Sequence, residues 1–381
     1  MSSCSCVTIR ASSSVLCKEL VSISGVISSR PLVPILEDFL FSVDDNVLTI
    51  TVSDLQTFVV TKMNVESSGD VKIAIPSRIL IDTLKNLPDQ PIAIKITNDT
   101  NIVEIITSNG KYKIVGESAE SYPRVKMNNA DDEIIIDSGV LKKTLQTTII
   151  AASSDPLKPI INSVCFDFSV NKMVVVSTDT HRLIKCCCNI ANDKIVTLVI
   201  PKKSLQVLIN LINADCDTTI SFNSHYVCIK NDKILLFSTL LNDRFPDYER
   251  AIPKGYRNQL KVSRIDMIET LKRVATYVNM IKKQVQMTVK NNKITVLADD
   301  LNLNNQAIEI IECSCNFGFP LSICFNVKHL QEILQGINAD EVIFWLSDVN
   351  ESGISNKAAV VYPSDQVEDC FVEMLIMPIF V

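Results

Sequence analysis

The chain has 381 residues, of which 47% are hydrophobic and 21% are charged, so it can bury a large core and is not intrinsically disordered. This length predicts two or three domains, and no apolar run approaches the roughly 20 residues of a membrane-spanning helix. The Ser- and Cys-rich N-terminus lacks the apolar segment of a signal peptide, so we expect a soluble cytoplasmic protein without membrane association.

The 13 cysteines do not have the spacing of a disulfide framework or of a zinc site. No C-x-x-C pair occurs, and no histidine stands at zinc-finger spacing from a cysteine. A free cysteine in a cytosolic chain commonly acts as a small buried hydrophobe. Acidic pairs such as Asp131-Asp132 are interpreted as solvated turn residues. We therefore predict no metal site and no cofactor.

The predicted elements begin with an amphipathic helix and continue mainly with short strands. In chain order they are a helix from Val15, strands Val47–Val52 and Thr57–Lys62, a second helix over Ile75–Pro88, and strands Ile92–Ile96 and Val103–Thr107. Asp44-Asp45-Asn46 and Asn109-Gly110 predict the tight turns. Along the second helix, Ile75, Ile79, Leu80, Leu84 and Leu87 are expected to line one buried face.

This pattern then repeats twice, with further strands at Met173–Ser177 and Ile234–Leu240. The second helix recurs at Ile200–Asn213 and Phe325–Asn338, each 125 residues further on, and the first recurs from Val140 and Met267. Strands outnumber helices and short turns separate them, so the class is α+β with mostly antiparallel sheets. Polar connections near Ser121–Asp132 and Ile252–Asn258 predict three similar domains, each of two helices packed on antiparallel sheets, at residues 1–128, 129–254 and 255–381.

Positive charge concentrates on the predicted helices, although the whole chain carries −6. The six helical windows hold eleven basic and five acidic residues, a net charge of +6, so the remainder carries −12. If the helices share one surface, that surface suits sequence-independent contact with phosphates. The alternative is that these side chains only solubilise the helices.

Five motifs in the same order resemble the bacterial DNA sliding clamp family, the beta subunit of the replicative DNA polymerase III. They are Ser28–Leu36, Ile75-Pro-Ser-Arg with Leu87-Pro-Asp, Thr178-Asp-Thr-His-Arg-Leu183, Arg244-Phe-Pro-Asp-Tyr248 with Arg250 and Pro253, and Met377-Pro-Ile379. The resemblance implies a head-to-tail homodimeric ring of three-domain subunits, with helices lining the hole. It also implies a catalytically inert processivity factor that encircles duplex DNA.

The resemblance implies two sets of site residues. By resemblance the DNA contacts fall on Arg30 and Arg78, with Lys85 as an addition. Lys203 and Lys328, which recur at the position of Arg78 in the other two repeats, are also predicted to contact DNA, as is Lys158. In the segment Asp155–Ile160, Pro159 and Ile160 stand where some family members carry tyrosines, which leaves only Lys158 as an electrostatic substitute. The implied partners beyond duplex DNA are the polymerase III alpha subunit, the clamp-loader delta subunit and other proteins with a clamp-binding motif.

Those partners share a pocket for a short hydrophobic peptide in the family, and Arg182 and Arg250 are expected to flank it. Its residues here are Ile161, Thr178, Thr180, His181, Arg182, Leu183, Pro246, Arg250, Ala251, Asn326, His329, Leu375, Ile376, Met377, Pro378 and Ile379. Three positions depart from the family: Thr180 replaces a glycine, His329 replaces a common tyrosine, and Phe380-Val381 replaces the usual end.

Two other functions were weighed against the clamp. Ser177, Asp179 and His181 supply the residue types of a hydrolytic triad, but they lie within one strand-to-turn segment and no G-x-S-x-G motif occurs. We therefore expect no catalytic residue, and we expect Asp179 to anchor the turn. The second alternative is a clamp paralogue or protein-interaction scaffold that does not encircle DNA.

Overall fold

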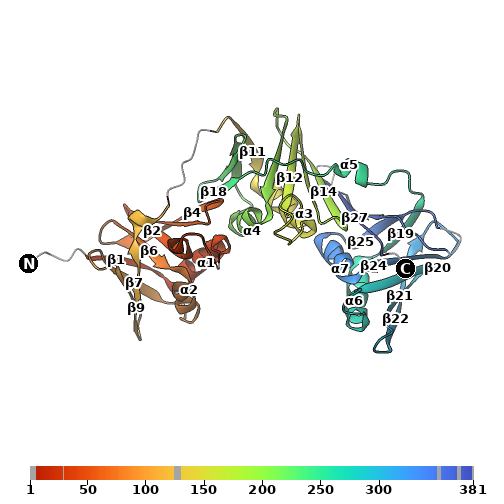
Figure 1. The fold of residues 1–381 in the computed structure, drawn as a ribbon, viewed down its shortest axis with the longest axis horizontal. Helices are drawn as coiled ribbons and strands as arrows, with labels where there is room; N and C mark the ends of the chain where they lie inside the picture. The colour runs from red at the N-terminus through yellow and green to blue at the C-terminus, as the bar shows by residue number, and fades with distance from the viewer. Residues whose placement is uncertain (1–5, 29, 124–129, 350–352, 367–369, 380–381) are drawn as a thin grey trace, which may run out of the picture. The chain divides into compact units, whose positions relative to one another are not determined.

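The computed structural model describes residues 6–28, 30–123, 130–349, 353–366 and 370–379 (Figure 1). Its contacts define two compact units, Met1–Lys142 with Ile200–Asn242, and Lys143–Val199 with Asp243–Val381. Each unit therefore contains part of the central repeat. The predicted boundary between residues 128 and 129 falls outside the described residues, as do Phe380 and Val381.

The first unit contains helices and strands of the first repeat together with four strands of the central one. Its elements are β1 (Cys6–Ser12), α1 (Ser13–Ile23), η1 (Ser24–Val26), η2 (Pro34–Glu37), β2 (Asp38–Asp44), β3 (Val47–Ser53), β4 (Thr57–Asn64), β5 (Glu66–Ser67), β6 (Val71–Pro76), α2 (Ser77–Lys85), β7 (Pro91–Thr97), β8 (Ile102–Ile106), β9 (Lys111–Val115), β10 (Glu117–Ser118), η3 (Ala119–Ser121), β11 (Asp132–Asp137), α4 (Lys202–Leu211), β16 (Asp217–Phe222), β17 (Tyr226–Lys230) and β18 (Ile234–Thr239).

Helix α3 (Ser138–Thr148) begins in the first unit and ends in the second. Strand β15 (Val196–Pro201) begins in the second unit and ends in the first. The remaining elements of the second unit are η4 (Ile149–Ala151), β12 (Ser163–Ser169), β13 (Lys172–Thr178), β14 (Arg182–Asn189), α5 (Tyr248–Ala251), β19 (Asn258–Ser263), α6 (Arg264–Val274), η5 (Ala275–Tyr277), β20 (Gln284–Lys290), β21 (Lys293–Asp300), β22 (Asn305–Glu312), β23 (Ser314–Cys315), β24 (Leu321–Asn326), α7 (Val327–Gly336), β25 (Glu341–Leu346), β26 (Ala359–Pro363) and β27 (Cys370–Ile376).

Two of the four sheets continue from one repeat into the next. The first nine-stranded sheet has the order β10-β6-β2-β3-β4-β18-β17-β16-β11, and the second has the order β15-β12-β13-β14-β27-β26-β25-β19-β23. Antiparallel pairing of β4 with β18 and of β14 with β27 makes these junctions. The other two sheets have the orders β5-β1-β7-β8-β9 and β22-β21-β20-β24. Strand β9 is an edge strand of the first, and β22 is an edge strand of the second.

Local sequence explains the boundaries of these elements. At α1 the Ser12 side chain accepts a hydrogen bond from the Val15 amide, which caps the first turn of the helix. Asp45 and Asn46 both have positive φ between β2 and β3, as a two-residue hairpin turn requires, which confirms the predicted turn. Asn291 and Asn292 do the same between β20 and β21.

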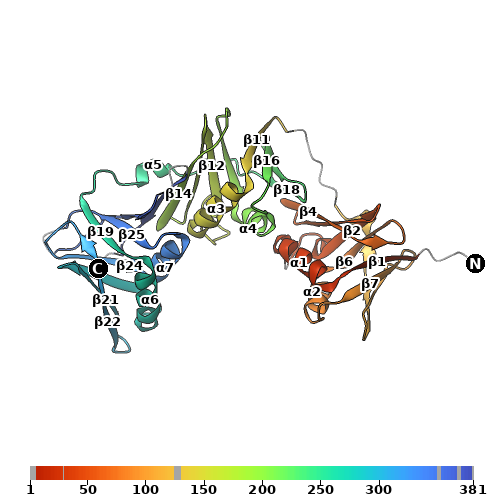
Figure 2. The ribbon, with the colours of Figure 1, turned by 180° about the vertical axis from the view of Figure 1, so that it is seen from behind.

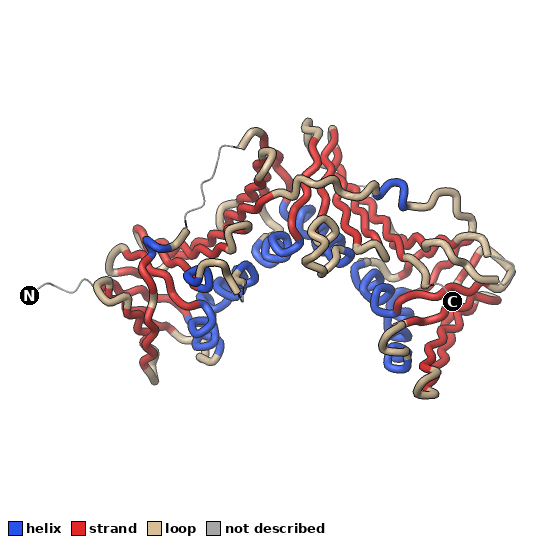
Figure 3. Tube along the Cα trace, viewed as in Figure 1, coloured by secondary structure: helices blue, strands red, loops and turns tan. Residues whose placement is uncertain are grey.

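Within each unit the helices pack on one side of the sheets. Helix α1 packs against α2 and α4 in the first unit, with β1, β2, β6 and β7 on the opposite side (Figure 2). In the second unit α6 and α7 pack together, and tube colouring shows them beside the strands that they cover (Figure 3). All six predicted helices are present, whereas the short helix α5 was not predicted.

The predicted buried face of the second helix is wrong at one position. Leu80 and Leu84 are buried, but Ile79 on α2 is 49% exposed. Ile75 is buried as part of β6 rather than the helix. Helical periodicity places Ile79 beside the apolar face of α2. It does not distinguish a side chain buried in the core from an apolar side chain on the surface.

The described cysteines are all free thiols, and Cys165, Cys186, Cys188 and Cys324 among them are buried. Among the residues that the structure describes, no helix is both long enough and apolar enough to cross a membrane.

Candidate functional site

The turn between β13 and β14 is organised by Asp179. One of its carboxylate oxygens accepts the amides of His181 and Arg182, each at 2.9 Å, and the Thr178 hydroxyl donates to the Arg182 carbonyl at 2.7 Å. These bonds confirm that Asp179 anchors the turn. Thr180 stands at its tip with φ of +78°, a conformation that glycine adopts freely and that a β-branched residue rarely does. The turn therefore keeps the conformation of a glycine turn although it carries threonine.

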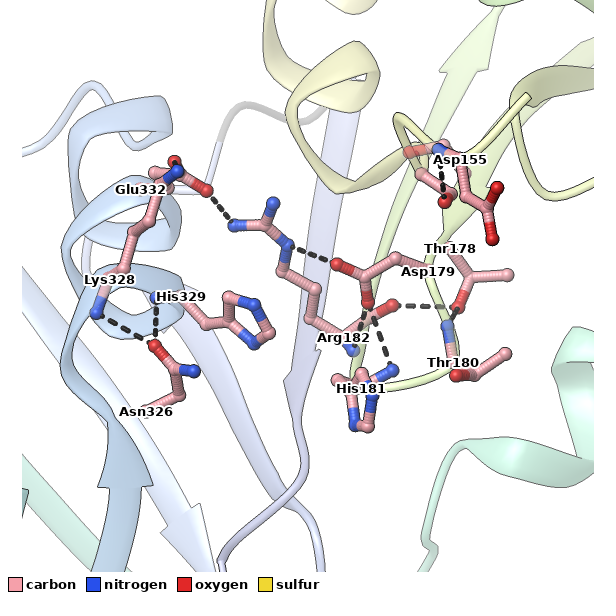
Figure 4. Close-up of polar contacts among 12 residues, drawn as sticks. Asp155, Thr178, Asp179, Thr180, His181, Arg182, Asn326, Lys328, His329 and Glu332 are labelled. Carbon is pink, nitrogen blue, oxygen red and sulfur yellow. Dashed lines mark hydrogen bonds and ion pairs between the residues drawn. The ribbon is translucent and has the colours of Figure 1, made fainter. Parts of the chain in front are cut away.

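Arg182 links this turn to helix α7. Its guanidinium donates to Asp179 at 3.0 Å and to Glu332 on α7, as Figure 4 shows. The Arg182 side chain is only 8% exposed. Nε and Nη1 of the guanidinium thus already donate to carboxylates of the same chain. Arg182 therefore joins the β13–β14 turn to helix α7. That Arg182 flanks an incoming peptide stays a prediction.

The rings of two histidines lie close together between the turn and helix α7. The rings of His181, on the turn, and His329, on α7, have centroids 5.9 Å apart. Asn326 caps α7 by accepting the amides of Lys328 and His329, which fixes the first turn of the helix (Figure 4). Burial lowers the pKa of the His329 imidazole, and the positive charge of Arg182 acts in the same direction.

The C-terminal stretch supplies an apolar side to the site. In β27 Ile376 pairs with Arg182 and Leu375 with Leu183, and all four residues are buried. The Met377 amide then donates to the His181 carbonyl at 2.8 Å, while the Met377 side chain is 40% exposed. We name this group of Asp179, His181, Arg182, His329, Glu332, Leu375, Ile376 and Met377 the turn–helix cluster.

The other predicted pocket residues lie around the cluster or apart from it. Pro378 is buried, Ile379 is partly buried and donates its amide to the Cys324 carbonyl at 2.8 Å, and Ile161 is buried in the loop before β12. Pro246, Arg250 and Ala251 are exposed at or beside α5, and Arg250 pairs with Asp247. Helix α5 reaches the neighbouring strand through Glu249, which lies 2.5 Å from Lys185 of β14. No sequence signal singled out Glu332.

The predicted DNA-contact residues differ in how free their charges are. Among the described residues, no carboxylate lies within ion-pair distance of Arg78 or Lys85, and both side chains are exposed on α2. Lys203, in contrast, lies 2.5 Å from Asp54 and also donates to the Val26 carbonyl, so part of its charge is compensated.

Three further predicted DNA contacts are exposed. Arg30 and Lys158 are both exposed, and Lys158 lies in the segment 155–160, where its amide donates to the Asp155 carbonyl. Lys328 is exposed, although Glu332 lies 3.8 Å away.

The residue types of a hydrolytic triad do not form a reacting group. The Ser177 hydroxyl is fully buried and donates to the Thr148 carbonyl, and Asp179 is engaged by the turn and by Arg182.

The repeated helix pairs on continuous antiparallel sheets define the architecture of a DNA clamp subunit. Family models of the DNA polymerase III beta subunit match the chain in order, with the N-terminal domain at residues 7–126, the central domain at 135–247 and the C-terminal domain at 249–378. The chain belongs to the DNA polymerase III beta subunit family.

Relatives and solved structures agree with this assignment over nearly the whole length. The beta sliding clamp of Haemophilus influenzae is 24% identical over 369 residues, covering 95% of this chain and 97% of the relative. That of Pseudomonas aeruginosa is 25% identical over 363 residues, covering 94% and 96%. The fold is similar to the sliding clamp structure from Bartonella birtlesii, with a TM-score of 0.88 at 23% identity, covering 99% of this chain and 100% of that one. The beta subunit from Thermotoga maritima gives 0.86 at 22%, covering 98% and 100%.

Proposed function

We propose that this chain is a DNA sliding clamp, a non-catalytic subunit that encircles duplex DNA in the cytoplasm and tethers DNA polymerase III to it. The observation that carries the proposal is the ordered match of all three domain models of the family along one chain. The domains are proposed to be residues 1–128, 129–254 and 255–381. The exposed cations of α2 support contact with phosphates, which is independent of base sequence.

The test distinguishes a topological link from surface binding. After loading onto nicked circular DNA, the protein should remain bound at high salt and should dissociate when the circle is linearised. A basic-surface binder would leave both DNA forms as salt rises, because its affinity depends on counterion release. That result would support the alternative, a paralogue or scaffold that does not encircle DNA.

The ring is proposed to close through two of the terminal strands, β9 and β22. A terminal strand presents unpaired backbone groups, which another chain can pair with. Strand β9 carries Lys111 and Lys113 beside the exposed Tyr112 and Val115, whereas β22 carries Glu309 and Glu312.

Apolar side chains surround both strands. Ile308 and Ile310 of β22 are 57% and 61% exposed. Beside β9 a hollow of about 560 Å³ is lined by Tyr112, Ile79 and Leu87 among others. The exposed Ile79 is therefore available to contact another subunit. The exposed apolar residues of both strands support head-to-tail pairing of β9 in one subunit with β22 in another. Opposite charge contributes less to this pairing, because Lys111, Glu309 and Glu312 already form ion pairs with Glu104, Arg273 and Lys293 of the same chain.

The turn–helix cluster is proposed to bind a short hydrophobic peptide from the partners, namely the polymerase alpha subunit, the clamp-loader delta subunit and other proteins with the same motif. Met377, whose side chain is 40% exposed, offers a flexible thioether to a hydrophobic partner, and the buried Leu375 and Ile376 hold this segment in place. Deletion of residues 377–381 should abolish binding of a labelled peptide carrying that motif while the dimer persists. Unchanged peptide affinity would overturn the assignment.

A further inference from the structure

Three thiols lie on one face of the strand pair β14–β27 in the second unit. Cys188 of β14 stands directly opposite Cys370 of β27, and Cys186 stands opposite Val372. Residues directly opposite each other on antiparallel strands project to the same face. Cys187 projects to the other face, because successive side chains of a strand alternate.

The Cys188 and Cys370 thiols converge on one hydroxyl group. Thr144 Oγ1 of α3 lies 3.3 Å from Cys188 Sγ and 4.0 Å from Cys370 Sγ. Opposite residues of an antiparallel pair have Cα atoms about 4.5 or 5.5 Å apart, and a disulfide requires about 4.4–6.8 Å. The strand register therefore places these two residues within the Cα separation of a disulfide.

The two thiols differ in access and in acidity. Cys188 is fully buried, whereas Cys370 is partly exposed and lines a cavity of about 390 Å³ together with Lys143, Cys186, Asp365 and Gln366. A hydrogen bond from Cys188 lowers the pKa of the Cys370 thiol to about 7, helped by Thr144 and by the charge of Lys143. The same hydrogen bond raises the pKa of Cys188. Cys370 is therefore the accessible thiolate and Cys188 the protected partner.

We propose that Cys188 and Cys370 form a reversible disulfide by exchange with a small-molecule disulfide, such as oxidised glutathione, that enters this cavity. The Cys370 thiolate attacks one sulfur of the reagent and expels one glutathione thiolate, which leaves a mixed disulfide at Cys370. Cys188 then attacks Cys370 Sγ and expels the second glutathione sulfur, which leaves as the thiol because it takes up the Cys188 proton. Two protein thiols are thereby oxidised by two electrons, and one glutathione disulfide is reduced to two thiols.

The bond would join the two strands whose other end carries the turn–helix cluster. Arg182 and Leu183 lie at the start of β14 and pair with Ile376 and Leu375 at the end of β27. A covalent link at Cys188 would prevent these strands from separating. Oxidation should therefore slow amide hydrogen exchange in β27 at least several-fold, and reduction should reverse the change.

The experiment uses the full chain equilibrated with defined ratios of oxidised and reduced glutathione, followed by alkylation under denaturing conditions and peptide mass mapping. Two fewer free thiols per chain are expected, with Cys188 linked to Cys370. Cys188→Ser should stop at a glutathione adduct on Cys370. Before oxidation, iodoacetamide at pH 7 should alkylate Cys370 about fivefold faster than an ordinary thiol, because its larger thiolate fraction outweighs its lower nucleophilicity.

Matched controls keep the assignment falsifiable. Cys187→Ser changes the same strand on its other face, and Cys186→Ser removes the remaining thiol of the cavity; both should leave the Cys188–Cys370 link intact. The proposal is overturned if the folded protein gives no such link at any glutathione ratio. It is also overturned if Cys370→Ser, folded by circular dichroism, still forms an internal disulfide and loses two free thiols on oxidation.

Discussion

Arg182 of β14 forms an ion pair with Glu332 of α7, a residue 150 positions further along the chain. Because the Arg182 side chain is 8% exposed and also binds Asp179, its charge is compensated entirely within the folded chain. Removing Arg182 takes this cation away from Asp179 and Glu332, whose side chains are 14% and 28% exposed. Among the described residues only Lys328, 3.8 Å from Glu332, then remains as a nearby cation, so the loss is costly.

Arg182→Met should therefore lower the free energy of unfolding of the second unit by about 3 kcal/mol. The chain has one tryptophan, Trp345 in β25, so its fluorescence during urea unfolding reports on this unit. Arg250→Met is the matched control, since Arg250 is 88% exposed and pairs only across one helical turn; it should change stability by less than about 0.5 kcal/mol. Equal losses in both variants would contradict the structural role of Arg182.

Thr180→Gly should stabilise the protein by about 1 kcal/mol, because it relieves a β-branched residue of a positive φ. The same unfolding measurement checks it. Asn304→Gly is a suitable control: Asn304 has φ of +54°, which asparagine tolerates, so the substitution should be close to neutral. Destabilisation by Thr180→Gly would show that the threonine side chain contributes a contact that outweighs its backbone strain.

Asp38→Asn should remove a pH dependence from the first unit. Burial, reinforced by Glu117 and Glu37, raises the pKa of Asp38 to about 7, and its Oδ2 is buried without a hydrogen-bond partner among the described residues. The folded state thus holds the proton more tightly than the unfolded state. The resulting stability is present below pH 4 and is lost as pH rises toward 7, at up to about 1.4 kcal/mol per pH unit.

Hydrogen exchange of β2 and β6, compared between wild type and variant at each pH, measures this effect. The two proteins should differ more at pH 7.5 than at pH 5, with the variant more protected at the higher pH. A constant difference across this range would mean that Asp38 does not titrate there.

Arg78→Ala together with Lys85→Ala should reduce the dependence of DNA affinity on salt. Each lost phosphate contact lowers the slope of log K against log salt by about 0.9, so the double variant should lose about 1.8. Lys203→Ala should have a smaller effect, because Asp54 already compensates that charge. Fluorescence anisotropy with duplex DNA across a salt series provides the slopes. An effect of Lys203→Ala equal to that of Arg78→Ala would contradict this ranking.

Ile310→Lys should weaken the dimer at least tenfold, because it places a cation on β22 opposite the proposed lysines of β9. Ile310→Glu removes the same apolar side chain but keeps the opposite sign, so its loss should be smaller. Sedimentation equilibrium at low and high salt measures both, and the difference should shrink as salt screens the charges. Equal dissociation constants at low salt would exclude β9 as the partner strand.

Sequence patterns predicted the helices, the hairpin turns and the role of Asp179, because these depend on neighbours within a few residues. They did not predict that β4 pairs with β18 or β14 with β27. Strands pair through backbone groups, which are the same in every residue, so the side-chain pattern of a strand does not identify a distant partner strand. The ion pair of Arg182 with Glu332 was not predicted for the same reason, because Glu332 is remote in sequence. Helical periodicity misplaced Ile79, which is apolar but faces outward.

The continuous sheets have a consequence for dissecting this protein into fragments. The sequence repeat does not coincide with a hydrogen-bonded unit, because strands of the central repeat pair with strands of both neighbouring repeats. A truncation designed at a repeat boundary would expose a long row of unpaired amides and carbonyls, and such an edge promotes aggregation. Fragments for biophysical work should therefore be cut so that each hydrogen-bonded sheet stays whole, and not at the repeat boundaries.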